Sequence, residues 1–131
     1  MSVFEPIIYI DHSEIRSGKI EELKTAIKEL AELVKNNEPR IISYNAYLIE
    51  QSNSLSVIHI HPDSASLEFH GKVAGSAFAK FVNLVKLLTI DVYGHPSNIA
   101  IEQLRKKANL LGNATLAVHR LHAGFSRFGV C

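Results

Sequence analysis

The chain has 131 residues, with 14 Lys and Arg against 13 Asp and Glu, and its net charge is +1 when the histidines are neutral. This length fits one domain over residues 1–131, and a charge so close to zero lacks the positive field that a nucleic-acid partner requires. The sequence has one cysteine, Cys131, no leader-like start and no apolar run of about 18 residues, so we expect a cytoplasmic protein without disulfides or a membrane partner.

Hydrophobic patterning predicts a strand, a helix and a hairpin in the first half of the chain. Residues 7–12 are β-branched and aromatic on both faces, which is typical of a strand buried on both sides. Residues 19–35 place apolar side chains three and four apart between Glu and Lys, as an amphipathic helix does. Residues 41–49 and 55–61 are two further strands separated by a short polar turn, so we expect them to pair as a hairpin.

The third strand should end at Pro62, and a short helix should follow it. Asp63 or Ser64 can cap this helix, which we expect to reach Phe69. The stretch 71–75 begins and ends with glycine and predicts a break before a longer helix. One face of the longer helix would carry an apolar set: Phe78, Phe81, Val82 and Val85.

A further strand and a second helix–strand unit complete the pattern. Residues 87–93 predict the fourth strand. Ser97 can cap a third helix that ends at about Leu111, and the basic run 105–107 on this helix is expected to face water. Residues 115–121 predict a fifth strand.

The resulting order, strand-helix-strand-strand-helix-strand, is the split βαβ plan of ferredoxin-like domains. We therefore predict an α+β fold with an antiparallel sheet over residues 7–93, and an appended helix and strand over residues 97–121. No linker or repeat divides the chain, so both parts should belong to a single domain.

Residues 7–93 resemble the antibiotic-biosynthesis-monooxygenase-like proteins of the dimeric α/β-barrel superfamily. Two features carry the resemblance: the first strand leads to Ser-Gly-Lys at 17–19 and an acidic helix, and the third leads through Pro62-Asp63 to Ser-Leu-Glu-Phe-His at 66–70. The resemblance implies strand order 4-1-3-2, helices on one face, and a second copy's sheet on the other. A homodimer is therefore the expected assembly.

The resemblance also implies an activity. Members of the superfamily include cofactor-free oxygenases of phenols and quinols, and haem-degrading enzymes. In the haem-degrading members an asparagine on the first strand, a tryptophan and a haem-ligating histidine carry the activity. In this chain the asparagine position falls at or near Asp11, tryptophan is missing, and Ala-Lys-Phe at 79–81 stands where the histidine is expected. The resemblance therefore disfavours haem degradation. We therefore expect a cofactor-independent monooxygenase-like enzyme that acts on a small aromatic or quinol-type substrate.

The candidate site follows from the hairpin. If it closes around Ser52, Asn45 lies opposite His59, and one face of the hairpin carries Ser43, Asn45, Tyr47, His59 and His61. Such a polar group needs mutual hydrogen bonds or a ligand, so it predicts the wall of a cavity. The candidate catalytic residues are His59 and His70. The candidate substrate-binding residues are Asn45, Tyr47, His61 and Phe78.

Two other interpretations remain open. His59 and His61 on one strand face could begin a metal site, but His12 should lie at the far end of its strand pair and His70 nearly two helical turns beyond Pro62. We therefore expect no metal. Alternatively, the protein is a non-catalytic homodimer that binds a small apolar ligand or serves as an assembly module, with the histidines only filling hydrogen bonds.

Overall fold

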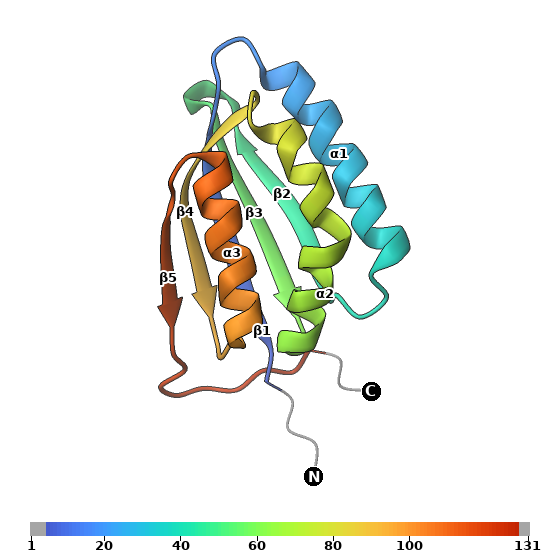
Figure 1. Cartoon of the computed structure of the whole chain (residues 1–131), viewed down its shortest axis with the longest axis vertical. Helices are drawn as coiled ribbons and strands as arrows, with labels where there is room; N and C mark the ends of the chain where they lie inside the picture. The colour runs from blue at the N-terminus through green and yellow to red at the C-terminus, as the bar shows by residue number, and fades with distance from the viewer. Residues whose placement is uncertain (1–4, 129–131) are drawn as a thin grey trace.

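The computed structural model describes residues 5–128, which form a five-stranded sheet with three α-helices on one face (Figure 1). The strands are β1 (Ile7–Ile15), β2 (Ser43–Ile49), β3 (Ser54–His61), β4 (Val85–Tyr93) and β5 (Thr115–His119). The helices are α1 (Ile20–Asn37), α2 (Ser64–Ala74) and α3 (Asn98–Leu111), with 3₁₀ segments η1 (Glu50–Ser52) and η2 (Gly75–Phe81). None of the helices in this part of the chain is both long and apolar enough to span a membrane.

The strand order is β2-β3-β1-β4-β5. The first four strands pair antiparallel in the predicted 4-1-3-2 arrangement, so the predicted α+β fold is confirmed. The appended unit adds β5 parallel to β4, because a helix between two strands returns the chain in its original direction. Within residues 5–128, β4 and β5 are the one parallel pair of neighbouring strands in the sheet.

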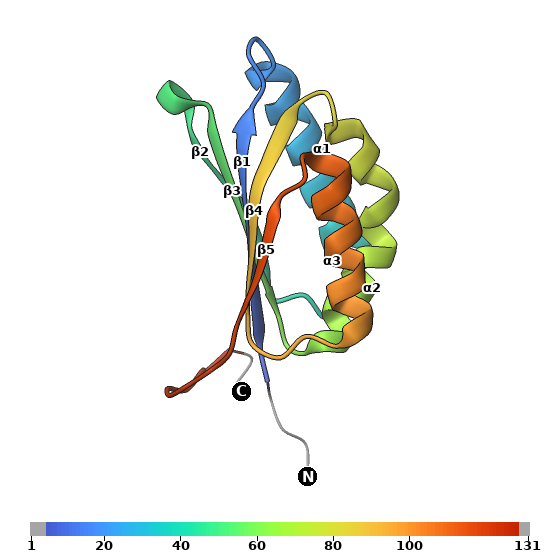
Figure 2. The ribbon, with the colours of Figure 1, turned by 60° about the vertical axis from the view of Figure 1, so that its left-hand side comes forward.

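The two faces of the sheet differ in their covering. Along β1, alternate side chains from Ile7 to Ile15 are buried beneath the helices. Ile8 and Ile10 point the other way and are partly exposed. Figure 2 shows that α1, α2 and α3 all lie on the same side, so the opposite face, here called the outer face, carries no α-helix of residues 5–128. The predicted apolar character on both sides is present, but within one chain only the helix-facing side is buried.

Helix α2 differs from its prediction. It runs without interruption past Gly71 to Ala74 and then tightens into η2, so the predicted break and the longer helix after it are wrong. Gly71 faces α3, where a Cβ would lie 2.6 Å from the end of the Gln103 side chain and would make that side chain move. Val85, expected on the longer helix, is the first residue of β4.

The predicted hairpin register is also wrong, by one residue. Tyr44 lies opposite His59, and Asn45 lies opposite Ile58. The connection is one residue shorter than expected, because Asn53 adopts a left-handed conformation (φ 52°) and closes the turn after η1. Since side chains alternate between faces, three side chains expected beside the histidines point to the outer face: Ser43, Asn45 and Tyr47.

Candidate functional site

Polar side chains are buried between the sheet and the helices, in a layer that is otherwise apolar. They are Asp11, Ser13, Glu38, His59, His61, Ser66, His70 and Lys107. Burying a charged group costs several kcal/mol unless it is paired. A concentration of such groups in one layer therefore marks a candidate functional site.

Lys107 lies inside this layer, which contradicts the prediction that the whole basic run 105–107 faces water. Arg105 and Lys106 are exposed as expected. Lys107, however, falls three residues after Leu104 and four before Leu111, on the buried stripe of α3. Residues at these spacings share one face of a helix, so the helix turns this ammonium group toward the sheet.

Lys107 makes hydrogen bonds to two buried side chains of β1, Asp11 and Tyr9. Its Nζ donates a hydrogen bond to Asp11 Oδ2 at 2.6 Å and another to Tyr9 Oη. The ammonium also lies 4.5 Å from the centroid of the Phe78 ring, within range of a cation–π contact. Asp11 Oδ1 has no hydrogen-bond partner among the described residues. Burial, reinforced by the charge of Asp11, raises the pKa of Tyr9 well above its usual value, so Tyr9 remains a neutral phenol.

A cavity of about 40 Å³ lies next to this pair. Its polar wall consists of Asp11, Ser13, Tyr44 and Lys107, and apolar side chains from α1, η2, α3 and the sheet complete it. Phe78, a predicted substrate-binding residue, lies in this wall. The cavity has room for a few water molecules, whereas pockets for drug-sized ligands have roughly 300–1,000 Å³. An aromatic substrate would therefore need lining side chains to move.

The three predicted histidines come together beside the cavity. The rings of His59 and His61 have their centroids 5.0 and 5.5 Å from that of His70. His59 stacks flat on Tyr9, with centroids 3.8 Å apart and planes 2° apart. Tyr44 meets His59 edge-on at 4.9 Å. Tyr44 thus touches the histidines on one side and lines the cavity on the other.

Each of these three rings makes a hydrogen bond through Nδ1. His59 Nδ1 donates to the Tyr9 carbonyl at 3.0 Å, and His70 Nδ1 donates to Glu38 Oε2 at 2.8 Å. His61 Nδ1 shares a 2.8 Å hydrogen bond with the Ser66 hydroxyl. Burial, with a smaller effect from His70, lowers the pKa of His59 well below 6.5 and that of His61 to about 3. Both rings are therefore neutral at pH 7.

Several polar atoms of this cluster have no partner among the described residues: His61 Nε2, His70 Nε2 and Glu38 Oε1. No three His, Cys, Asp or Glu side chains within residues 5–128 are placed to hold a metal ion. Glu38 binds Nδ1 of His70, on the opposite edge of the ring from the free Nε2. A shared ion at Nε2 is therefore out of reach of this carboxylate.

The remaining predicted residues lie elsewhere. Asn45 and Tyr47 are exposed on the outer face, so the structure does not bring them to His59 and His70. His12 is also exposed, near the far end of β1 from His61, as predicted. Lys107 and Glu38, two buried acid–base groups, were not among the residues predicted from the sequence. A signal existed for each, because Lys107 falls on the apolar stripe of its helix and Glu38 stands directly before Pro39.

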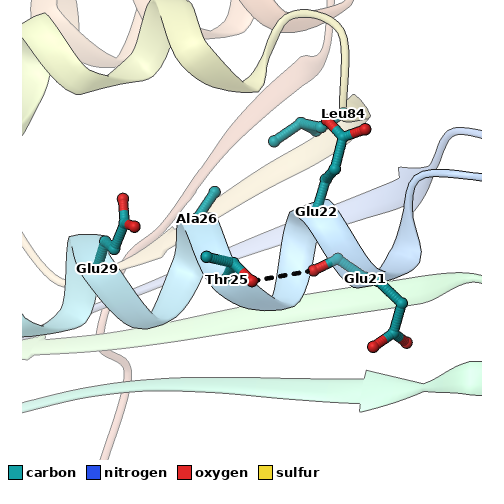
Figure 3. A pocket seen from close by; sticks show the side chains of 6 residues that line it. All are labelled: Glu21, Glu22, Thr25, Ala26, Glu29 and Leu84. Carbon is teal, nitrogen blue, oxygen red and sulfur yellow. Dashed lines mark hydrogen bonds between the residues drawn. The ribbon is translucent and has the colours of Figure 1, made fainter.

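A larger hollow of about 450 Å³ lies on the surface along α1 (Figure 3). It is lined by the exposed residues Glu21, Glu22 and Glu29, with Leu84 at its edge. Of the buried atoms that lack a partner in the described part of the chain, none belongs to a residue of this hollow. Solvated carboxylates on a helix face need no ligand, so we assign no function to it.

No protein-family model and no curated protein matches this chain, but solved structures do. MupZ from Pseudomonas fluorescens has a TM-score of 0.73 at 16% identity, over 97% of this chain and 93% of MupZ. A Caulobacter crescentus CB15 protein, provisionally assigned as an antibiotic biosynthesis monooxygenase, has a TM-score of 0.50 at 24% identity, over 56% of this chain and 76% of its own. This chain has the antibiotic-biosynthesis-monooxygenase-like fold. SnoaB from Streptomyces nogalater, a cofactor-independent oxygenase, shares that fold with a TM-score of 0.60 at 10% identity. Identities this low establish the fold alone.

The matches differ in how much of the chain they include. The match to SnoaB covers 72% of this chain and 96% of SnoaB, close to the share that residues 7–93 make up. The match to MupZ covers 97% of this chain and therefore extends over α3 and β5. Lys107 thus belongs to a unit that is shared with MupZ but lies outside the ferredoxin-like core.

The cavity does not fit a haem, the group that some proteins of this fold degrade. Among the described residues that line it, none is a histidine that could bind the iron. The position expected for that histidine falls in η2, where Ala79 and Lys80 are exposed. We derive no haem chemistry for this chain.

Proposed function

We propose that the chain is a cofactor-independent oxygenase-like enzyme that oxidises a small phenol or quinol-type substrate in the cavity between the sheet and the helices. The observation that carries the proposal is the buried Asp11–Lys107 pair in the wall of that otherwise apolar cavity. The shared fold with SnoaB supports the reaction class. Because fold alone does not establish function, the chemistry of the pair is the stronger support.

The pair can bind a hydroxyl group in one orientation. A lysine ammonium has three N–H donors, and two of them serve Asp11 Oδ2 and Tyr9 Oη. The third N–H and the free Asp11 Oδ1 remain for a ligand. A phenol hydroxyl can donate to Oδ1 and accept from Lys107. When the phenol loses its proton, the ammonium stabilises the phenolate in a site with few waters, where such stabilisation is strong.

The oxidation needs no electrons from outside. The phenol gives its proton to Asp11, and the phenolate passes an electron to O₂; the radical and superoxide combine at the ring carbon para to the oxygen. Asp11 returns its proton to the resulting peroxide. A second base removes the proton from the para carbon as the O–O bond breaks, and the leaving hydroxide takes up that proton as water. Phenol and O₂ thus become quinone and water.

His70 is our candidate for the second base, with His59 beside it. A phenol whose hydroxyl is held by Asp11 and Lys107 points its para carbon away from them, and Tyr44 lies between this end of the cavity and the histidines. His70 Nε2 has no partner among the described residues and can accept a proton. His59 and His61 are neutral and support the polar wall.

Room for the substrate must come from movable side chains. Tyr44 is partly exposed on the edge strand β2, and Phe78 is partly exposed on η2. A 3₁₀ segment has poorer hydrogen-bond geometry than an α-helix, so η2 is the element around the cavity that moves at least cost. We propose that movement of Phe78 on η2 and rotation of the Tyr44 side chain join the cavity to the histidines.

The test is oxygen uptake on a panel of phenols and quinol-type compounds that have hydrogen on the carbon para to a hydroxyl. We expect uptake by the wild type, and a loss of about 10²–10⁴-fold in kcat for Asp11→Asn, the range for a general base. His12→Ala, at an exposed position outside the cavity, is the matched control and should retain activity. Binding of the panel compounds without any uptake would favour the non-catalytic ligand-binding interpretation. Full activity in Asp11→Asn would contradict the proposed site.

We also propose that the outer face packs against a second copy of the chain. This face is apolar along its centre, and a sheet with such a face uncovered invites association. Asn45 and Tyr47 would then lie in the dimer interface, on the opposite side of the sheet from the cavity. The apolar side chains that support this proposal are Ile8, Ile10, Ile58 and Ile60 along the centre, with Ile49 and Tyr93 nearer the edges.

A further inference from the structure

Glu38 occupies a position that is unfavourable for a carboxylate. It is the C-terminal cap of α1, and its backbone N–H donates to the Val34 carbonyl. A negative charge is destabilising at this end of a helix, where the unpaired carbonyls already concentrate negative charge. Burial adds a desolvation cost, and the Glu38 side chain is only 2% exposed. Something other than helix stability therefore accounts for this residue.

The local sequence directs the Glu38 side chain inward. Pro39 restricts the preceding residue to extended conformations, and Glu38 has φ −122° and ψ 86°. The chain thus leaves the helix at once, and the carboxylate lies beneath α2, against His70. Glu38, at the end of α1, thus supports a side chain on the neighbouring helix α2.

The contact with His70 is specific. Glu38 Oε2 accepts from His70 Nδ1 at 2.8 Å, and the His70 side chain is 3% exposed. An ionised carboxylate can only accept, so this bond keeps a proton on Nδ1, and Nε2 is the ring nitrogen that can exchange a proton with a substrate. Glu38 Oε1 and His70 Nε2 both lack a partner within residues 5–128. A pair selected for stability alone would satisfy these atoms.

We propose that Glu38 is a positioning residue: it holds His70 in the tautomer whose Nε2 takes the ring proton from the substrate. This inference rests on the proposed function, in which His70 is the second base. The geometry of the pair parallels other carboxylate–histidine pairs, where the acid orients the ring and strengthens it as a base. Its chemical requirement is a substrate that loses a proton from carbon at the histidine end of the cavity.

The primary test does not depend on activity. In protein labelled with ¹⁵N-histidine, the ¹⁵N shifts of His70, assigned by their loss in His70→Asn, report which ring nitrogen carries the proton. We expect Nδ1–H in the wild type. In Glu38→Gln the amide can either accept from Nδ1–H or donate to a bare Nδ1, so the Nε2–H tautomer should appear. Glu38→Asp retains a carboxylate and should keep more of the Nδ1–H form.

Kinetics give the second readout. We expect kcat to fall by about 10–100-fold in Glu38→Gln, the usual effect of losing such an orienting partner, while KM changes little. Glu50→Gln, at an exposed glutamate that pairs with Lys24, is the matched control and should change neither kcat nor the His70 tautomer. Glu38→Asp should recover part of the loss.

The outcomes separate the two proposals. The inference is wrong, and Glu38 has a structural role, if two results are found together. The His70 tautomer is the same in the wild type, Glu38→Gln and Glu38→Asp, and the variants lose activity only in proportion to their loss of folded protein. If the tautomer depends on Glu38 but the wild type oxidises no phenol, the positioning role stands and the proposed oxidation fails.

Discussion

Lys107→Met should destabilise the fold strongly, because it removes the cation from a buried pair. The side chains of Lys107 and Asp11 are 8% and 7% exposed, so the variant leaves the Asp11 carboxylate buried without its counter-ion. Breaking a buried pair in this way costs about 3–5 kcal/mol. For a domain of this size, each kcal/mol lowers Tm by roughly 4 °C, which predicts a fall of about 12–20 °C.

A second substitution separates the pair's cost from its function. Replacing both partners with apolar side chains of similar size is often neutral or stabilising, so Asp11→Leu combined with Lys107→Met should recover most of the lost stability. The Tyr9 hydroxyl then lacks its lysine donor, which costs about 1 kcal/mol. The double variant should nevertheless have no oxygenase activity, because the site that binds and deprotonates the phenol is gone.

The assay is thermal and denaturant unfolding of the wild type, both single variants and the double variant, with Lys106→Met as the control. Lys106 is exposed on the same helix, so its loss should change stability by no more than about 0.5 kcal/mol. A Lys107→Met variant as stable as the Lys106→Met control would mean that water solvates the ammonium. The pair would then carry no cost that a function has to explain.

Three other predictions concern the histidines, the cavity and the outer face. Stability should fall as pH drops from 7 to 5: the pKa of His59 lies well below 6.5 and that of His61 is about 3, so only the unfolded chain takes up these protons. Each ring changes the free energy of unfolding by up to about 1.4 kcal/mol per pH unit. In urea unfolding, His61→Gln should reduce the slope of this free energy against pH. A free energy of unfolding that does not change with pH would contradict the burial of neutral rings. Phe78→Ala should widen the cavity and let the protein bind indole, measured as a rise in Tm on addition; no rise would mean that Phe78 does not limit the space. Ile58→Lys should produce monomers in analytical ultracentrifugation while Ile99→Lys, exposed on α3, leaves the assembly unchanged; identical behaviour of the two variants would argue against a dimer through the outer face.

The fold was accessible from the sequence because its elements have strong periodicities. Alternating and helical patterns located the strands and the first and third helices, and Asp63 and Ser97 cap α2 and α3 as expected, accepting from the N–H groups of Ser66 and Ala100. The hairpin register was not accessible in the same way. It depends on one residue, Asn53, adopting a left-handed conformation, and a slip of one residue exchanges the two faces of the strand.

The candidate site was predictable only in part. His59, His61 and His70 come together because two lie on one strand face and the third on the helix that follows. Lys107 was missed because a lysine within a run of three basic residues usually faces water, and because its partner Asp11 is 96 positions away in the sequence. Contacts between such distant residues depend on the packing of α3 against the sheet, which local patterns do not specify.

The most direct test of the central claim is a single turnover with ¹⁸O₂ on a phenol that the wild type oxidises. The proposed chemistry predicts that one labelled oxygen atom enters each quinone and that the other is released as water. Asp11→Asn should form no labelled quinone in the same time. A quinone without label, or label incorporated equally well by Asp11→Asn, would contradict oxygenation at the Asp11–Lys107 pair.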